Sequence, residues 1–209
     1  MTDQLIVCEK PVGLVSEEGG LPDRLRAELG GEIYCVHRLD KAVGGLMVYA
    51  RSADAAARLS KLLTAGELTK EYLAIVPDRL EADSGEFVDL IFHDKAKNHS
   101  YVVKRMRHGV KEARLRCERL ASQGGNALVR VHLLTGRSHQ IRCQFASRAM
   151  PLSGDAKYGS MTRNRDIALY AYRLRFSDPF TRKAVDITSY PVGEAWEELL
   201  KKAKYAGQF

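Results

Sequence analysis

The part of the chain that most restricts its fold is a pair of strand-like segments joined by a short loop. KEARLRCERL (111–120) and ALVRVHLL (127–134) are rich in residues that favour β-strands, and SQGGN (122–126) between them is typical of a hairpin turn. Strands joined so closely pair in antiparallel fashion, because a parallel pair needs a crossover of about a dozen residues or more. The sheet is therefore expected to be largely antiparallel.

Further strands and helices are predicted on both sides of this hairpin from apolar periodicity and from Gly, Pro and Ser boundaries. The predicted strands are residues 5–11, 45–52, 69–76, 87–92, 101–105, 169–180 and 184–190. The predicted helices are residues 21–31, 53–65, 136–150 and 194–205. Because no repeat or linker separates these elements, we expect one α+β (mixed) domain over residues 1–209, with helices flanking the sheet, rather than a βαβ nucleotide fold.

Positive charge is concentrated in one part of the chain. The sequence has 33 Lys+Arg and 26 Asp+Glu, and its net charge of +7 favours polyanionic partners, above all nucleic acid. Residues 95–119 hold nine basic residues and only two acidic ones. Three of the nine, Arg114, Arg116 and Arg119, are expected to project together from the exposed face of one strand. This segment is either a solvated surface or a surface that follows the phosphates of a nucleic acid.

The motif HRLD, residues 37–40, places an arginine and a carboxylate directly before a predicted strand. Side chains two residues apart on extended backbone point the same way, so Arg38 and Asp40 share one side and His37 lies on the other. The Gly-Gly pair at 44–45 can permit close approach of a ligand to the backbone. The motif is therefore either a surface ion pair or a carboxylate held for chemistry.

Three other stretches carry residues suited to chemistry. In TGRSHQIR, residues 135–142, the start of a helix offers backbone N–H groups to a phosphate, and Arg142 lies one turn further on, where it can pair with a buried carboxylate. In TKEYLAIV, Lys70 and Tyr72 share a strand face, and the tyrosine belongs either to the core or to a base-stacking site. The loop SGDAKYGS, residues 153–160, indicates only a turn.

Several classes of protein are excluded or disfavoured. The four cysteines are scattered singly and the six histidines show no ligand spacing, which disfavours a disulfide framework and a metal site. The sequence has no run of about 18 apolar residues, as a membrane-spanning helix requires. Its first residues lack a basic region before their short apolar run, so they do not match a secretion signal. A cytoplasmic protein without membrane contact is expected.

The motifs together resemble a known family, the RluA-type pseudouridine synthases. That family carries, in order, K-P-x-G-L, H-R-L-D, a K-x-Y strand, T-G-R-x-H-Q-I-R and a G-D-x-x-Y-G loop. The corresponding residues here are 10–16, 37–40, 70–72, 135–142 and 154–159. The chain departs from the family at Val43-Gly44-Gly45, where Thr-Ser-Gly is usual, and at Ser138, where threonine is commoner. Both departures bear on substrate contacts rather than on the reaction class.

The resemblance implies the pseudouridine synthase fold around a basic cleft and conversion of uridine in rRNA or tRNA to pseudouridine without a cofactor. Asp40 matches the catalytic aspartate, Tyr72 the tyrosine that stacks on uracil, and Arg142 the cation that keeps the aspartate ionised. The sequence leaves open whether the aspartate attacks C1′, adds to the base or takes a proton from C2′. The residues expected to bind RNA are His37, Arg38, Lys70, Arg114, Arg116, Arg119, Arg137, His139 and Gln140.

Because the first motif begins at residue 10, no separate N-terminal RNA-binding domain is expected, and the arginines of 137–148 and 163–175 should help the 95–119 segment to hold RNA. A monomer without an obligate protein partner is expected. The alternative function is a non-catalytic RNA-binding protein with the same fold. A third possibility, a carboxylate-dependent RNA hydrolase, lacks a second acidic partner or metal cluster.

Overall fold

The computed structural model describes residues 3–162 and 166–209 and divides the chain into two compact units. Unit 1 comprises Met1–Glu71 and Tyr170–Pro191, and unit 2 comprises Tyr72–Leu169 and Val192–Phe209. The single catalytic domain expected for the whole chain stays a prediction. Arg163 and Arg165, two of the arginines expected to help hold RNA, lie outside the described residues.

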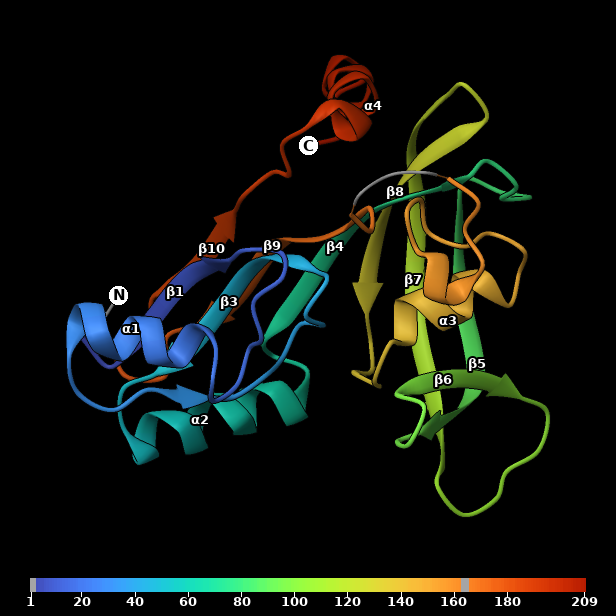
Figure 1. The fold of residues 1–209 in the computed structure, drawn as a ribbon. Helices are drawn as coiled ribbons and strands as arrows, with labels where there is room; N and C mark the ends of the chain where they lie inside the picture. The colour runs from blue at the N-terminus through green and yellow to red at the C-terminus, as the bar shows by residue number, and fades with distance from the viewer. Residues whose placement is uncertain (1–2, 163–165) are drawn as a thin grey trace. The chain divides into compact units, whose positions relative to one another are not determined.

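Unit 1 contains strands of both orientations and two helices. Its elements are β1 (Leu5–Lys10), α1 (Leu21–Leu29), β2 (Tyr34–Cys35), β3 (Gly44–Ala50), α2 (Ala53–Ala65), the start of β4 (Thr69–Pro77), most of β9 (Leu169–Ser177) and β10 (Ala184–Thr188). β1 and β2 pair antiparallel with β3, and β10 pairs antiparallel with β9. β3 and β9 run parallel (Figure 1).

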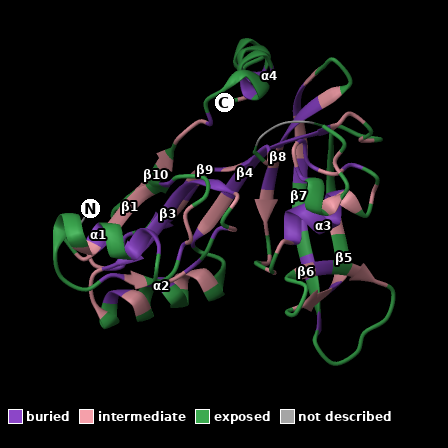
Figure 2. Ribbon diagram, in the orientation of Figure 1, coloured by how far each residue is buried: buried purple, intermediate pink, exposed green. Residues whose placement is uncertain are grey.

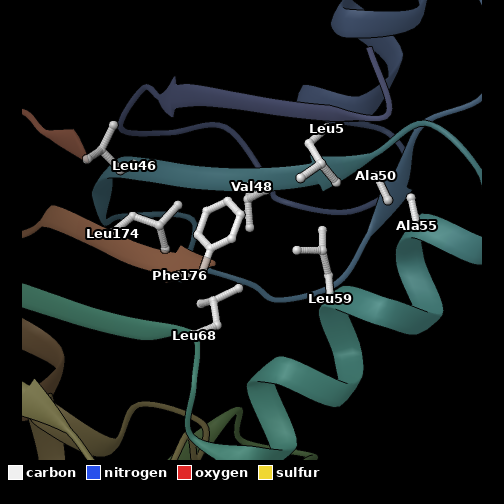
Figure 3. Packing of buried hydrophobic residues seen from close by; sticks show 9 residues of the cluster. All are labelled: Leu5, Leu46, Val48, Ala50, Ala55, Leu59, Leu68, Leu174 and Phe176. Carbon is white, nitrogen blue, oxygen red and sulfur yellow. The ribbon is translucent and has the colours of Figure 1, made fainter. Parts of the chain in front are cut away.

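The core of unit 1 lies between this sheet and α2. α2 begins where Ser52 accepts a hydrogen bond from the Ala55 N–H (3.2 Å), and it ends at Gly66, whose φ of 75° is left-handed. Leu59 on α2 is fully buried against Phe176 and other apolar side chains of the strands (Figure 3). Figure 2 shows β3 buried along its whole length while α2 exposes its outer side. This burial fixes the end of β3 that follows the HRLD motif.

Unit 2 is built on a sheet in which β4, β8, β7, β5 and β6 are neighbours in that order, and the pairs β8–β7, β7–β5 and β5–β6 are antiparallel. Its other elements are β5 (Ser84–Asp94), β6 (His99–Val103), β7 (Val110–Gln123), β8 (Asn126–Leu133), α3 (Gln140–Ala146), the 3-10 turn η1 (Ala156–Tyr158) and α4 (Glu194–Tyr205). The predicted hairpin is confirmed, because β7 and β8 are joined through Gly124 and Gly125, which both have positive φ.

The predicted α+β class and largely antiparallel pairing are confirmed, and β5 and α3 are among the elements whose length differs from the predicted one. β5 is longer than the predicted 87–92, since its polar first residues pair with β7. α3 is shorter than the predicted 136–150, because a turn with His139 at φ 51° precedes it and Ala149 at φ 56° follows it. In the described part of the chain, no helix combines the length and apolar character needed to cross a bilayer.

Candidate active site

Asp40 lies in the connection between β2 and β3, and the segment KPVGLVS (10–16) holds this connection in place. The Ser16 hydroxyl accepts a hydrogen bond from the Leu39 N–H (3.0 Å) and donates one to the Leu39 carbonyl (3.0 Å). On the other side, the Val43 N–H donates to the Asp40 carbonyl (2.9 Å). Two motifs that are separate in the sequence thus form one structural piece that fixes the backbone on both sides of Asp40.

Lys10 adds a buried cation to the same piece. Its side chain is only 1% exposed, and Nζ donates to the carbonyls of Leu14 (2.7 Å), Pro11 (3.0 Å) and Lys41 (3.4 Å). Burial lowers the pKa of Lys10 to about 8, and the nearby Asp40 carboxylate opposes this change. Lys10 is a site residue that was not predicted, although its place in the K-P motif was a signal.

The predicted alternation of side chains along HRLD is confirmed. Leu39 and His37 are buried, whereas Arg38 is exposed. The Arg38 guanidinium pairs with Glu17 (3.2 Å), and both side chains are more than half exposed. Such an exposed pair contributes little to stability, so Arg38 can exchange this partner for a phosphate at low cost.

His37 lies in the interior of unit 1. Its side chain is 7% exposed and its Nε2 accepts a hydrogen bond from the Val48 N–H of β3 (3.2 Å). Burial, helped by the charge of Lys70, lowers the pKa of His37 well below its ordinary value. His37 is therefore neutral, and the structure gives it a supporting position rather than the exposed one that a direct RNA contact needs.

Lys70 and Tyr72 lie two residues apart in β4, as predicted. Lys70 is half-buried, and burial lowers its pKa to about 8. Tyr72 is 4% exposed. Between them, Glu71 accepts hydrogen bonds from the Tyr172 hydroxyl (2.7 Å) and from Arg175 (3.0 Å), which ties β4 to β9 within unit 1.

The Gly-Gly pair has a different role from the predicted one. A Cβ on Gly45, whose φ is 119°, would lie 2.4 Å from the Ala171 carbonyl oxygen and 2.6 Å from its nitrogen. A Cβ on Gly44 would lie 3.2 Å from a methyl carbon of Val12. The space beside these glycines is filled by the chain itself, so the expectation that they make room for a ligand is wrong. They allow β9 to approach β3.

In unit 2, Arg142 is held by a carboxylate of the loop SGDAKYGS, for which the sequence predicts only a turn. Arg142 and Asp155 are 5% and 0% exposed, and their bidentate pair has Nε–Oδ2 and Nη2–Oδ1 distances of 2.7 and 2.8 Å. The expectation that Arg142 pairs with a buried carboxylate is confirmed for Asp155. The G-D-x-x-Y-G loop was the signal for this residue.

The same loop also contacts His139. The Tyr158 hydroxyl accepts a hydrogen bond from the Ser100 N–H (2.8 Å) and shares another with Nδ1 of His139 (2.9 Å). The Arg142 guanidinium lies over the Tyr158 ring, 4.9 Å from its centroid. The loop at 154–159 and the motif at 135–142 are therefore one structural piece, as the two N-terminal motifs are in unit 1.

Gln140 and Arg137 hold the turn before α3 against β7. The Gln140 side-chain oxygen accepts hydrogen bonds from the Thr135 hydroxyl (2.8 Å) and from the Arg137 N–H (2.9 Å). Its nitrogen donates to the Arg114 carbonyl (3.0 Å), and Arg137 Nε donates to the Glu112 carbonyl (2.8 Å). The Arg137 N–H, one of the groups expected to bind a phosphate, is thus occupied by Gln140.

The three strand arginines do not project as unopposed charge, contrary to the sequence analysis. Glu86 of β5 pairs with Arg114 (2.6 Å) and Arg116 (3.1 Å), which lowers the pKa of Glu86. Arg119 pairs instead with two aspartates at 2.6 Å each, and its side chain is 23% exposed. A β-bulge follows Arg119 in β7. The three acids, Asp78, Asp83 and Glu86, lie outside residues 95–119, so the charge of that segment alone does not include them.

Comparisons with known proteins agree on one family. A family model described as RNA pseudouridylate synthase matches residues 4–147. The dual-specificity RNA pseudouridine synthase RluA of Vibrio vulnificus is 32% identical, over 85% of this chain and 76% of the relative. The tRNA pseudouridine synthase C of Haemophilus ducreyi is 27% identical, over 96% of this chain and 92% of the relative. The solved structure of human RNA Pseudouridylate Synthase Domain Containing 4 superposes with a TM-score of 0.77 at 21% identity, over 98% of this chain and 91% of the human one.

Proposed function

The chain belongs to the RNA pseudouridylate synthase family, and from this premise we propose which of its residues convert a uridine of RNA into pseudouridine. The activity follows from the family, so the chain is an RNA pseudouridine synthase, an isomerase. One observation carries the proposal: the family match over residues 4–147 contains all three predicted catalytic residues, Asp40, Tyr72 and Arg142.

The reaction is an isomerisation within one nucleotide. The N1–C1′ bond breaks, the uracil turns, and C5 forms a bond to C1′, while C5 loses one proton and N1 gains one. We assign Asp40 to this bond as the catalytic carboxylate. The hydrogen bonds of Ser16 and Val43 to its flanking backbone support the assignment, because a group that acts on one bond must be held in a fixed position.

We assign Tyr72 to stack on the target uracil and Arg142 to keep the catalytic carboxylate ionised. A nearby cation favours the charged form of a carboxyl group and so opposes the effect of desolvation. The plane of the Arg142 guanidinium is fixed by its bidentate pair with Asp155, which supports a role that depends on orientation. Within unit 1, His37 supports the segment that carries Asp40, and within unit 2, Gln140 supports the turn before Arg142.

The target base is inaccessible inside a helix, so the enzyme must flip it out, at a cost of about a few kcal/mol. We assign Arg38 to hold the flipped nucleotide, because its exposed pair with Glu17 is easily exchanged for a phosphate. Relatives are named for tRNA and for the ribosomal large subunit, which supports rRNA or tRNA as the substrate class.

We also propose that both units serve one catalytic domain and that the enzyme works as a cytoplasmic monomer. All four cysteines, Cys8, Cys35, Cys117 and Cys143, are free thiols, as is usual in a reducing compartment. Light scattering of the purified protein should give the mass of one chain of 23.3 kDa.

Pseudouridine mapping of cellular RNA tests the proposed function. Deletion of the gene should remove pseudouridine at one or more positions, and wild type should restore it while Asp40→Asn should not. Asp54→Asn is the matched control, because Asp54 is an exposed carboxylate on α2. Purified Asp40→Asn should still bind RNA that wild type modifies. A non-catalytic RNA-binding protein would leave the pseudouridine map unchanged on deletion, and full activity of Asp40→Asn would refute the catalytic assignment.

A further inference from the structure

Three aromatic rings of unit 2 lie in a row, with one stacked pair and one tilted pair. The His99 ring lies 4.3 Å from the Tyr158 centroid at an interplanar angle of 26°, and 4.5 Å from the Tyr101 centroid at 38°. Tyr101 and Tyr158 make no ring contact with each other among the described side chains, although each lies so close to His99. The two tyrosines therefore lie on opposite sides of the histidine, in the order Tyr158, His99, Tyr101.

The inner end of this stack is fixed and its outer end is exposed. Tyr158 is held through its hydroxyl by Ser100 and His139, and the Arg142 guanidinium lies 4.9 Å from its ring centroid. Tyr101, at the other end, is 40% exposed. An aromatic ring that is anchored on one side and open on the other offers a rigid platform to a further flat group.

The charge of the residues around the outer end is positive. Residues 95–111 hold six basic residues and no acidic one, and all six are exposed. They are Lys95, Lys97, Lys104, Arg105, Arg107 and Lys111. Within residues 3–162 and 166–209, none of the six forms an ion pair, in contrast to Arg114, Arg116 and Arg119. Figure 1 shows the loop after β6 extending away from β5 and β7. The available charge of the 95–119 segment is therefore on both sides of β6, the strand that carries Tyr101.

We propose that Tyr101 is a second RNA contact of this enzyme, on which an unpaired nucleobase of the substrate stacks while the six basic residues of 95–111 hold the adjoining phosphates. The proposal rests on the proposed function only in naming RNA as the ligand. Single-stranded RNA combines the two features that this surface matches, because its bases are free to stack and its backbone is anionic. A duplex offers the phosphates without free base faces.

Binding of a labelled 12-nucleotide oligoadenylate, followed by fluorescence anisotropy, tests the stack. The probe contains no uridine, so the result is independent of catalysis. Stacking of one base on a side chain changes Kd by about five- to 150-fold, so Tyr101→Ala should weaken binding at least about fivefold while Tyr101→Phe keeps it. Tyr205→Ala is the control, because Tyr205 is 82% exposed on α4. A duplex of equal length should bind Tyr101→Ala as it binds wild type. Equal oligoadenylate affinity of Tyr101→Ala and Tyr101→Phe would overturn the proposal.

Quenching of tryptophan fluorescence reports contact with a base directly, without comparing the affinities of two variants. The chain has one tryptophan, Trp196, which is buried, so a tryptophan at position 101 supplies a new exposed fluorophore. Oligoadenylate should quench Tyr101→Trp and leave Tyr205→Trp unchanged; equal quenching of both would contradict a stack at Tyr101.

The phosphate part is tested by the salt dependence of the same binding. Each lost phosphate contact reduces the slope of log K against log salt by about 0.7 for a single strand. The double variant Lys104→Gln/Arg105→Gln should therefore lower the slope by about 1.4. Arg114→Gln/Arg116→Gln should lower it by much less, because these two arginines already pair with Glu86. A larger change of slope for the Arg114/Arg116 variant than for the Lys104/Arg105 variant would show that RNA follows β7 instead of β6. If wild type shows this binding pattern but forms no pseudouridine, the proposed function fails while the RNA contact at Tyr101 stands.

Discussion

The buried pair between Arg142 and Asp155 allows one prediction to be worked out from the structure. Asp155→Asn keeps the size of the side chain and one oxygen, but it removes the negative charge beside a guanidinium whose side chain is 6% exposed. Removing one partner of a buried pair costs about 3–5 kcal/mol, because the remaining charge stays desolvated without compensation. For a chain of 209 residues, each kcal/mol lowers Tm by about 2–4 °C. The expected fall in Tm is therefore roughly 6–20 °C.

The chain provides a matched control in the pair of Arg173 and Asp186. This pair has the same bidentate geometry, with distances of 2.8 and 2.7 Å, but its side chains are 30% and 45% exposed. An exposed pair of this kind is worth about 0–1 kcal/mol. Asp186→Asn should therefore lower Tm by less than about 4 °C. The two substitutions differ in burial and hardly at all in hydrogen-bond geometry.

Thermal unfolding followed by circular dichroism, with both variants and wild type at the same pH and salt, checks the difference. If Asp155→Asn lowers Tm no more than Asp186→Asn does, burial does not set the strength of the pair, and the reasoning is refuted. The same variant should also lose pseudouridine formation at temperatures where it stays folded, since Arg142 then lacks the group that fixes its plane.

Three further predictions concern unit 1. Lys10→Met should lower the free energy of unfolding by about 2–4 kcal/mol, measured by urea titration, because it leaves three partly buried hydrogen-bond acceptors without their donor; an unchanged value would contradict this. Gly45→Ala should fail to give folded protein or lose more than about 3 kcal/mol in the same assay, because its Cβ would strike the Ala171 backbone, whereas Gly44→Ala should lose less. The stability of wild type should fall as the pH drops below about 6.5, by up to about 1.4 kcal/mol per pH unit, because unfolded His37 takes up a proton that the folded form, with its lowered pKa, does not. His37→Gln should lack this part of the slope between pH 5 and 7, and equal slopes would show that His37 titrates alike in both states.

Local signals predicted the elements of this chain well. The cap at Ser52, the glycine at 66 and the leucine stripe place α2 at its observed residues, because these signals act within one or two turns. The hairpin of β7 and β8 follows from its own loop. What failed depends on residues that are distant in sequence. Glu86 neutralises two arginines from a neighbouring strand, and the space beside Gly45 is filled from a strand more than a hundred residues later.

The order of the motifs predicted the family but not the task of each motif residue. A motif residue can be required because it touches the substrate or because it holds another motif in place, and the sequence does not distinguish the two. The structure favours the second role for Ser16 and Lys10, which hold the backbone around Asp40. Asp155 has the same relation to Arg142. Loss of activity in a variant of such a residue is therefore no proof of contact with RNA. A supporting residue should change stability and activity together, whereas Asp40→Asn should abolish turnover and leave the free energy of unfolding and RNA binding close to those of wild type.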